Sequence, residues 1–304
     1  MPCNTWPRFL AYHTDDPRSI ARSEERRLAA ARLSRATRDE IDPEAAFRLS
    51  ACNYAARIAY AQLATDHVTS FTAALPRSAP IFWVTLIRDT YTLPYDTAAD
   101  LDLFKLQQWA RAELRGASFV GMVEAALYTN ADAVRTNWKR AISWHLHLLV
   151  WGISKQRMTE IRDSLNRRCR TLIPGVAAAH FRPVRPEKVE GQVLYMLKAP
   201  VNEYRIIAET RGVADPAPGE PLREFTGKFA SKKYQLGPGD LVRMANMLAG
   251  KRLDRLAFAA GDGRAVLSAL NCAARATERA FAAQERDRAA SQRSMARAQQ
   301  RRRR

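Results

Sequence analysis

Cysteine is scarce and scattered in this chain, and long apolar runs are missing. The four cysteines stand at positions 3, 52, 169 and 272, so no two of them form a Cys-x-x-Cys pair. This spacing gives no signature of a cysteine zinc site or a disulfide framework, and a reducing cytoplasm is the expected compartment. No apolar run approaches the roughly 20 residues that cross a bilayer, and the first residues lack the apolar core of a signal peptide. We therefore expect a cytoplasmic protein with no membrane partner.

Acidic residues are also few relative to basic ones. The sequence has 49 lysines and arginines against 31 aspartates and glutamates, which gives a net charge of +18. No acidic residue follows Asp287, and the sequence ends in four arginines. A polyanion, usually nucleic acid, is the partner that this charge predicts. A ribosomal or histone-like chain would share the charge, but 47% hydrophobic residues and six tryptophans indicate a packed globular body.

Apolar residues recur with the period of a strand or of a helix through the middle of the chain. The predicted strands are residues 81–87, 119–127, 143–151 and 176–184, and the predicted helices are residues 98–114, 154–172 and 186–197. This order predicts an α+β fold, in which helices cover a central antiparallel sheet.

Changes in composition along the chain suggest its domain boundaries. Several prolines and a glycine between residues 211 and 221 indicate a linker. After it we expect short helices at residues 240–248 and 251–259 and a longer helix at 265–288. The predicted units are a basic helical N-terminal extension (1–78), the α+β domain (79–210), the linker (211–221), a helical C-terminal region (222–288) and a disordered arginine-rich tail (289–304).

Two of the five histidines lie close together in the strand predicted over residues 143–151. Side chains two residues apart in a strand point to the same face and stand about 7 Å apart. His145 and His147 therefore project together, while Trp144 and Leu146 face the other side. Two neutral imidazoles on one face suit a metal ion, and a pair of hydrogen-bonded core histidines is the alternative.

Glu124 is the only charged residue of the preceding strand, residues 119–127. If residues 130–140 close an antiparallel hairpin, Glu124 lies opposite the neighbourhood of His145 and His147, where opposed Cβ atoms are about 5 Å apart. An edge glutamate that faces water is the alternative, but a buried unpaired carboxylate is costly. We predict that the three residues hold a divalent metal ion, Mn²⁺ or Mg²⁺ with Zn²⁺ as a further choice, and leave positions open for substrate oxygen.

A tyrosine and a lysine three residues apart belong to the helix that begins near Pro186. Tyr195 and Lys198 are expected to share one helix face with Gln192. A phenol with a pKa of about 10 is a weak nucleophile, but a neighbouring ammonium group favours its phenolate. The lysine can equally stabilise charge that develops on a phosphoryl group. The alternative is a tyrosine that only packs in the core.

Three motifs, in this order, resemble those of rolling-circle replication initiators of the HUH endonuclease superfamily. They are residues 81–86 (IFWVTL), His145-Leu146-His147 with Glu124 on the strand before it, and residues 195–198 (YMLK). The resemblance covers residues 79–205 and implies a ferredoxin- or RRM-like sheet. Ala199 stands where two-tyrosine members carry their second tyrosine, so the chain resembles the single-tyrosine type.

The resemblance implies an enzyme that nicks one DNA strand at an origin. Tyr195 would attack the scissile phosphate by metal-dependent transesterification, which leaves a 5′-phosphotyrosine and a free 3′-OH that primes synthesis. The metal would be held by His145, His147 and Glu124, and Lys198 would assist the tyrosine or steady the phosphate. Glu190, or else Glu187, is the candidate base for termination. The implied partners are origin DNA, as a hairpin or a single-stranded nick site, and a host helicase and polymerase.

Basic residues follow directly after the histidine strand, on one face of the helix predicted over residues 154–172. We expect them to contact the DNA backbone, and a merely solvated face is the alternative. They are Lys155, Arg157, Arg162, Arg167, Arg168 and Arg170. His180, in the next predicted strand, is a minor candidate for the site.

Other functions fit part of this pattern. A single-tyrosine transposase or a conjugative relaxase would share the chemistry, but relaxases usually place the tyrosine before the histidines and these transposases usually lack flanking helical regions. A non-catalytic basic nucleic-acid-binding protein would use the histidines only to pack a sheet. A barrel-type zinc hydrolase also uses His-x-His, but it needs further histidines and an aspartate at later strand ends.

Overall fold

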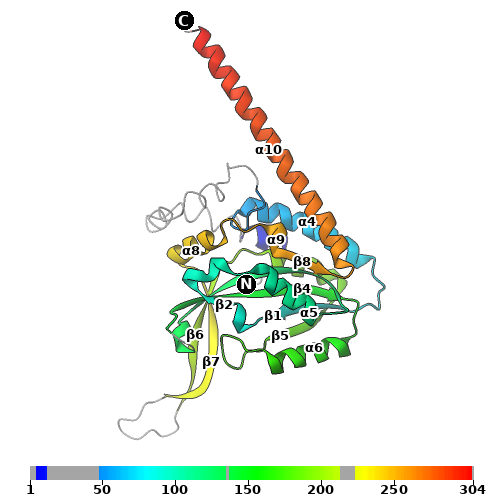
Figure 1. Cartoon of the computed structure of the whole chain (residues 1–304), viewed down its shortest axis with the longest axis vertical. Helices are drawn as coiled ribbons and strands as arrows, with labels where there is room; N and C mark the ends of the chain where they lie inside the picture. Colours follow the sequence, from blue (N-terminus) through cyan, green and yellow to red (C-terminus); the bar gives the residue numbers. More distant parts are fainter. Residues whose placement is uncertain (1–4, 12–47, 135–136, 213–222, 303–304) are drawn as a thin grey trace.

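The computed structural model describes residues 5–11, 48–134, 137–212 and 223–302, and Figure 1 shows the chain as a sheet surrounded by helices. Its main elements in chain order are α4 (Tyr54–Ala73), β1 (Ile81–Leu86), β2 (Thr92–Pro94), α5 (Leu103–Glu113), β3 (Ser118–Thr129), β4 (Arg140–Trp151), α6 (Lys155–Arg168), β5 (Ala179–Val184), α7 (Val189–Leu197), β6 (Asn202–Gly212), β7 (Arg223–Gln235), α8 (Pro238–Leu248), α9 (Leu253–Leu256), β8 (Ala257–Ala260) and α10 (Gly263–Arg302). Single turns of 3-10 helix lie between them at η1 (Asp89–Tyr91), η2 (Tyr95–Asp100), η3 (Ala131–Ala133) and η4 (Pro186–Lys188).

The strands form one sheet in the order β5-β1-β4-β3-β6-β7, with β2 also paired to β4 and β8 to β3. Every pair is antiparallel except β3 with β6, which is parallel. The α+β fold with helices over a sheet is therefore confirmed, and its central strands are antiparallel as expected. The parallel pair makes the whole sheet mixed.

The two central strands, β3 and β4, are buried over almost their whole length. A strand that is covered on both faces needs apolar residues at successive positions. This explains the apolar runs in β3, from Phe119 to Leu127, and in its partner β4. Asn130, with a φ of 56°, makes the left-handed step at the end of β3, a conformation that asparagine tolerates better than most residues. The twelve paired positions from Ser118↔Trp151 to Thr129↔Arg140 then fix which side chains face one another.

Different helices cover the two faces of β4. On the face of the histidines, the ring of Phe71 from α4 packs against Trp151 with ring centroids 5.2 Å apart, and α7 contacts both β3 and β4. On the other face, the indole Nε1 of Trp144 donates a hydrogen bond to the carbonyl of Ala98 in η2 at 3.0 Å. Helices α4 and α10 belong to the same hydrophobic core as the central strands, because Tyr60 and Leu270 are both part of it.

The C-terminal third differs from the sequence-based expectation. Strand β7 lies where a helical region was predicted, and it pairs with β6 from Asn202↔Gln235 to Gly212↔Arg223. Residues 251–259, predicted as one helix, form a single turn, α9, followed by β8. The helix prediction is wrong at these positions, because pairing with β6 and β3 supplies backbone hydrogen bonds that local sequence does not reveal.

The predicted disordered tail also differs, because α10 continues through it to Arg302. The sequence after Gly263 contains no further glycine or proline and is rich in alanine, arginine and glutamine. Alanine, arginine and glutamine have high helix propensity. The polar composition that led to the prediction of disorder is therefore compatible with a helix. Residues 1–4 and 12–47 of the predicted helical N-terminal extension and residues 213–221 of the predicted linker lie outside the described residues. Among the helices that are described, none is long and apolar enough to cross a membrane.

Candidate metal centre

Glu124, His145 and His147 meet on one face of the β3–β4 pair. Glu124 lies directly opposite His145 in the antiparallel register, as the sequence predicted. All three side chains are buried, and each offers one ligand atom that lies within 4.8 Å of the others. The Nε2 atoms of His147 and His145 are 3.2 and 3.9 Å from Oε2 of Glu124. Two imidazole nitrogens and one carboxylate oxygen at this spacing could occupy three coordination positions of one metal ion.

A backbone carbonyl fixes the tautomer of His145. Its Nδ1 lies 3.2 Å from the carbonyl oxygen of Ser143, and a carbonyl only accepts hydrogen bonds. Nδ1 therefore carries the proton and donates, which leaves the Nε2 lone pair on the side of Glu124. A second hydrogen bond of this kind is typical of metal-ligating histidines, because it sets the ring orientation.

His147 is held by a hydroxyl group. Thr85 of β1 is its cross-strand neighbour, and the Thr85 Oγ1 lies 3.0 Å from Nδ1 of the ring. With Nε2 donating to the Glu124 carboxylate, Nδ1 accepts from the threonine. When Nε2 instead binds a metal ion, Nδ1 carries the proton and the same hydroxyl accepts it, because a hydroxyl group serves in both directions. Thr85 thus supports either tautomer.

Burial keeps both imidazoles neutral. Desolvation lowers the pKa of His145 and lowers that of His147 to about 4, although the neighbouring carboxylate acts in the opposite direction. Burial alone raises the pKa of Glu124, but the Lys198 ammonium group and then the His147 hydrogen bond outweigh it and hold this pKa well below its usual range. At neutral pH the group therefore consists of two neutral imidazoles and one carboxylate, and a metal ion binds once the His147 proton has moved from Nε2 to Nδ1.

Tyr195 and Lys198 approach this group from α7. The Tyr195 ring lies edge-on to His147 and to Trp83, with centroids 5.3 and 5.6 Å apart. The Trp83 ring itself stacks on His147 at 5.0 Å. In the sequence Trp83 was only a member of the motif at residues 81–86, and its stacking on His147 was not predicted. Its place two residues before Thr85, on the same face of β1, was the signal available.

Lys198 lies just past the end of α7 and not on its face. With φ −57° and ψ 144° it is the residue at which the chain leaves the helix. Its ammonium group is 5% exposed and pairs with Oε2 of Glu124, and its Nζ lies 4.0 Å from the centroid of the Tyr195 ring. The structure thus brings the lysine to both the tyrosine and the carboxylate, by a route other than the shared helix face. Gln192, expected beside them, accepts a hydrogen bond from Arg182 at 2.8 Å.

The group of Glu124, His145 and His147 could hold a metal ion, with one condition. A metal ion and the Lys198 ammonium would both be attracted to Glu124, so binding requires the lysine to share the carboxylate or to turn toward the tyrosine ring that it already contacts. Two of the three ligands are neutral, and a single carboxylate accommodates both cations poorly. The geometry therefore shows a buried Glu-His-His group that could hold a metal ion.

The same sheet face continues to β5 at the edge of the sheet. His180 and Arg182 are exposed and lie opposite Thr85 and Trp83 respectively. His180 is therefore in one row with Thr85 and His147, but it is not among the three clustered ligands. Arg182 was missed in the sequence because nothing in its local pattern separates it from the other surface arginines.

The remaining predicted residues are not members of the buried group. Glu190 is exposed in the first turn of α7, and Glu187 is exposed in η4. Several arginines of α6 interact with protein groups: Arg157 with Glu160, Arg162 with Asp163, and Arg168 with Glu113 at 2.7 Å. Residues Lys155, Arg167 and Arg170 are exposed, on or directly after the same helix. The six predicted DNA contacts therefore do not all present an unneutralised charge.

Comparison with protein-family models, with curated proteins and with solved structures gives no match.

Proposed function

We propose that this protein is a metal-dependent endonuclease that nicks single-stranded DNA at an origin, as rolling-circle replication initiators do, with Tyr195 as the nucleophile. One observation carries the proposal. Two neutral imidazoles and a carboxylate converge in a buried group, and an aromatic ring that bears a hydroxyl lies 5.3 Å from one of these imidazoles. Metal ligands beside a tyrosine on a neighbouring helix are what phosphoryl transfer through a phosphotyrosine needs.

The proposed reaction exchanges one phosphoester bond for another. The Tyr195 oxygen attacks the scissile phosphorus, and the bond from phosphorus to the 3′ oxygen of the preceding nucleotide breaks. The phenolic proton is lost and the 3′ oxygen gains one, so the products are a 5′-phosphotyrosine and a free 3′-OH. A divalent ion, Mn²⁺ or Mg²⁺ or alternatively Zn²⁺, would supply the Lewis acid for a phosphate oxygen.

Lys198 has two roles in this proposal. Its ammonium group lies against the Tyr195 ring, and a cation there favours the phenolate over the phenol. If a metal ion takes over the charge of Glu124, the same ammonium becomes available to a phosphate oxygen of the substrate. Trp83 and Thr85 hold the His147 ring and thereby fix the geometry of the site.

The charge of the surrounding surface supports a DNA substrate. Arg182 and His180 are exposed on the same face of the sheet as the buried group, and the exposed Lys155, Arg167 and Arg170 lie on or just after α6, next to β5. Phosphate contacts of this kind position a strand without reading its sequence. Origin DNA, a host helicase and polymerase, and a cytoplasmic location complete the proposal. A transposase or relaxase would use the same chemistry and would differ in whether the 3′-OH primes synthesis.

One contact favours a second candidate, a non-catalytic nucleic-acid-binding protein. The ion pair between Lys198 and Glu124 already neutralises the buried carboxylate, so the histidines have a structural interpretation as well. The two candidates differ in metal binding and in covalent chemistry.

Metal binding is tested by thermal unfolding with added Mn²⁺. An ion that binds only the folded chain stabilises it by about 2.7 kcal/mol at 100 times its dissociation constant. We expect this gain for the wild type and its loss in His147→Ala. A His180→Ala variant is the matched control, because that histidine lies in the same row outside the cluster. Equal gains in all three proteins would contradict the metal centre.

The chemistry is tested with 3′-labelled single-stranded oligonucleotides of randomised sequence. The 3′ fragment would carry the label and stay attached to Tyr195, so an SDS-resistant labelled band should appear with Mn²⁺ and vanish in Tyr195→Phe. Tyr91→Phe is the control, since the Tyr91 hydroxyl only donates to the carbonyl of Lys105 at 3.4 Å. A wild type that binds Mn²⁺ and the oligonucleotides but forms no adduct would rule out the nickase and leave the binding protein.

A further inference from the structure

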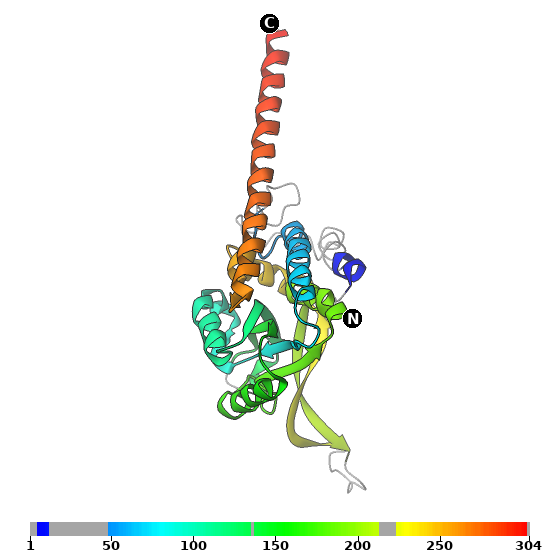
Figure 2. The ribbon, with the colours of Figure 1, turned by 90° about the vertical axis from the view of Figure 1, so that its right-hand side faces the viewer.

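Helix α10 extends far beyond the body of the molecule. It contains 40 residues, which at 1.5 Å per residue is about 60 Å. Its first part packs on α4, β3 and β8 through buried residues such as Val266, Leu270 and Ala274. The rest projects away as a straight rod, on the side opposite the β6–β7 hairpin, as Figures 1 and 2 show.

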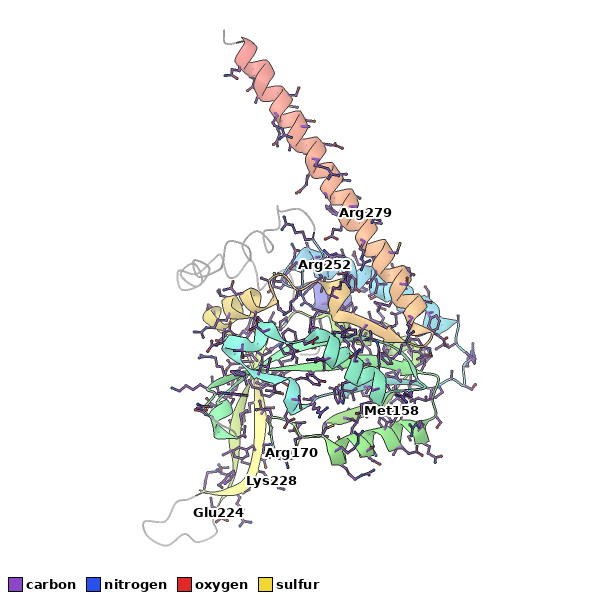
Figure 3. All side chains as sticks on the ribbon, viewed as in Figure 1. Met158, Arg170, Glu224, Lys228, Arg252 and Arg279 are labelled. Carbon is purple, nitrogen blue, oxygen red and sulfur yellow. The ribbon has the colours of Figure 1, made fainter. Side chains whose placement is uncertain are left out.

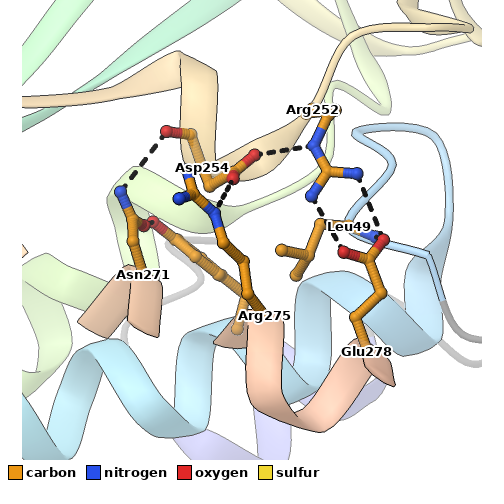
Figure 4. A network of polar contacts seen from close by, with 7 residues as sticks. Leu49, Arg252, Asp254, Asn271, Arg275 and Glu278 are labelled. Carbon is orange, nitrogen blue, oxygen red and sulfur yellow. Dashed lines mark hydrogen bonds and ion pairs between the residues drawn. The ribbon is translucent and has the colours of Figure 1, made fainter. Parts of the chain in front are cut away.

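A network of ion pairs fixes the direction of this rod at its base, and Figure 4 shows it. The buried carboxylate of Asp254, 1% exposed, accepts from Arg252 at 3.0 Å and from Arg275 of α10 at 2.8 Å. Glu278 of α10 accepts from the other side of the Arg252 guanidinium at 2.9 Å, and also from the backbone N–H of Leu49 at 3.0 Å. The helix is therefore tied to two separate segments of the body up to Glu278.

Directly after this anchor, arginines recur at seven-residue intervals. Arg279, labelled in Figure 3 where the helix leaves the body, is followed by Arg286 and Arg293, and all three are exposed. At 100° per residue, each step of seven rotates the position by only about 20° and advances it by about 10.5 Å. The three arginines thus lie in nearly one line along the helix. We call Arg279, Arg286 and Arg293 the arginine stripe.

Acidic residues stay off this line. Beyond Glu278 the helix has only Glu285 and Asp287, which lie about 120° and 80° around the helix from Arg279. The stripe therefore presents a single sign of charge to anything that lies along it.

Other occupants of this helix face need apolar residues that it lacks. A coiled coil with a second copy needs a seam of large apolar side chains, and a helix at a membrane surface needs an apolar face. In the sequence from residue 282 to residue 302, Met295 is the only large apolar residue, and it is 66% exposed. Duplex DNA instead offers about one phosphate charge per 1.7 Å of its axis, which matches a line of guanidinium groups that carries no acids.

We propose that the projecting half of α10 is a nucleic-acid-binding arm, whose arginine stripe contacts the phosphate backbone of a duplex. The arm acts without sequence preference and does not require the metal centre. It holds flanking duplex DNA against a body whose buried Glu-His-His group lies elsewhere in the sheet.

The test compares two triple variants of the full chain with equal loss of charge. One is Arg279→Gln/Arg286→Gln/Arg293→Gln, and the control is Arg77→Gln/Arg115→Gln/Arg288→Gln, in which all three sites are exposed and lie off the stripe. Binding to a labelled 30-base-pair duplex of arbitrary sequence is measured between 50 and 200 mM salt, without divalent ions. Each lost phosphate contact reduces the slope of log affinity against log salt by about 0.9.

We expect the slope of the stripe variant to be shallower by about 2.7, which corresponds to about 40-fold less loss of affinity over this salt range. The control variant should keep a slope close to that of the wild type, and Arg279→Lys/Arg286→Lys/Arg293→Lys should restore the wild-type slope because it restores the charges. Equal slopes for the stripe variant and the control would overturn the arm. So would stripe-dependent binding to acidic phospholipid vesicles with no stripe-dependent binding to the duplex.

Discussion

Glu124→Gln should destabilise the folded protein, because Glu124 and Lys198 form a buried ion pair. Both side chains are nearly inaccessible, at 8% and 5% exposure. Glu124→Gln keeps the shape of the side chain but removes its charge, so the Lys198 ammonium loses the carboxylate that offsets its burial. Removal of one partner of a buried pair costs about 3–5 kcal/mol. For a chain of this size, that cost corresponds to a melting temperature lower by roughly 6–20 °C.

A double variant separates this effect from simple loss of packing. Lys198→Met removes the other charge with a side chain of similar length, and alone it should destabilise the protein to a similar extent. In Glu124→Gln/Lys198→Met no charge of the pair remains buried, so the double variant should recover to within about 2 kcal/mol of the wild type. Urea unfolding of all four proteins in the presence of a chelator gives the coupling free energy.

Two results would refute the reasoning. If Glu124→Gln melts at the wild-type temperature, the carboxylate does not balance a buried ammonium. If the double variant is destabilised by the sum of the single effects, the two residues act independently and the pair is not a unit. Metal binding is a separate readout, because the recovered double variant lacks a ligand and should show no stabilisation by Mn²⁺.

Burial lowers the pKa of His147 in the folded protein to about 4, below the unfolded value of about 6.5. Between these pH values the unfolded chain binds more protons than the folded one, so the free energy of unfolding should fall as the pH drops from about 6.5 toward 4. In urea unfolding this fall should be less steep for His147→Gln. Thr85→Val removes the hydroxyl that orients His147, and should weaken Mn²⁺ binding by about 10- to 100-fold in calorimetry while the fold is kept. Gly263→Ala would place its Cβ 2.0 Å from the carbonyl oxygen of Phe119, so the start of α10 must shift. In urea unfolding we expect the free energy of unfolding to fall by about 3 kcal/mol or more. Gly239→Ala is the control and should cost far less, because there is open space around Gly239.

The three residues of the candidate metal centre were predictable from sequence because the relevant rules are local. His145 and His147 share a face in any strand, and a hairpin closed by residues 130–140 between two apolar strands places Glu124 opposite them. The register Glu124↔His145 confirms this step. A one-residue slip would have turned the carboxylate to the other face, and the pairing of the folded strands excludes it.

The residues that support these ligands were not predictable. Thr85 and Trp83 contact His147 from β1, and β1 pairs with β4 although about 60 residues separate them in sequence. No local periodicity specifies that pairing. Lys198 was singled out for a place on the helix face beside Tyr195, yet it reaches Glu124 because the backbone leaves the helix at that residue. The predicted contact between Lys198 and Tyr195 was therefore correct. The backbone conformation that brings Lys198 there was not predicted, because it depends on the packing of the folded chain.

The sequence by itself determined the α+β class, the central strands and the face on which the two imidazoles project, since these depend on alternation and on apolar runs within single segments. Only the tertiary structure decided that β7 and β8 are strands, that the Lys198 ammonium group lies in the buried group with Glu124, and that α10 stands clear of the body. Each of these depends on contacts between distant segments: strand partners that satisfy backbone hydrogen bonds, a carboxylate that stabilises a buried cation, and a network around Asp254 that anchors a helix base. Such contacts form only when the chain is folded, and for that reason no window of sequence contains them.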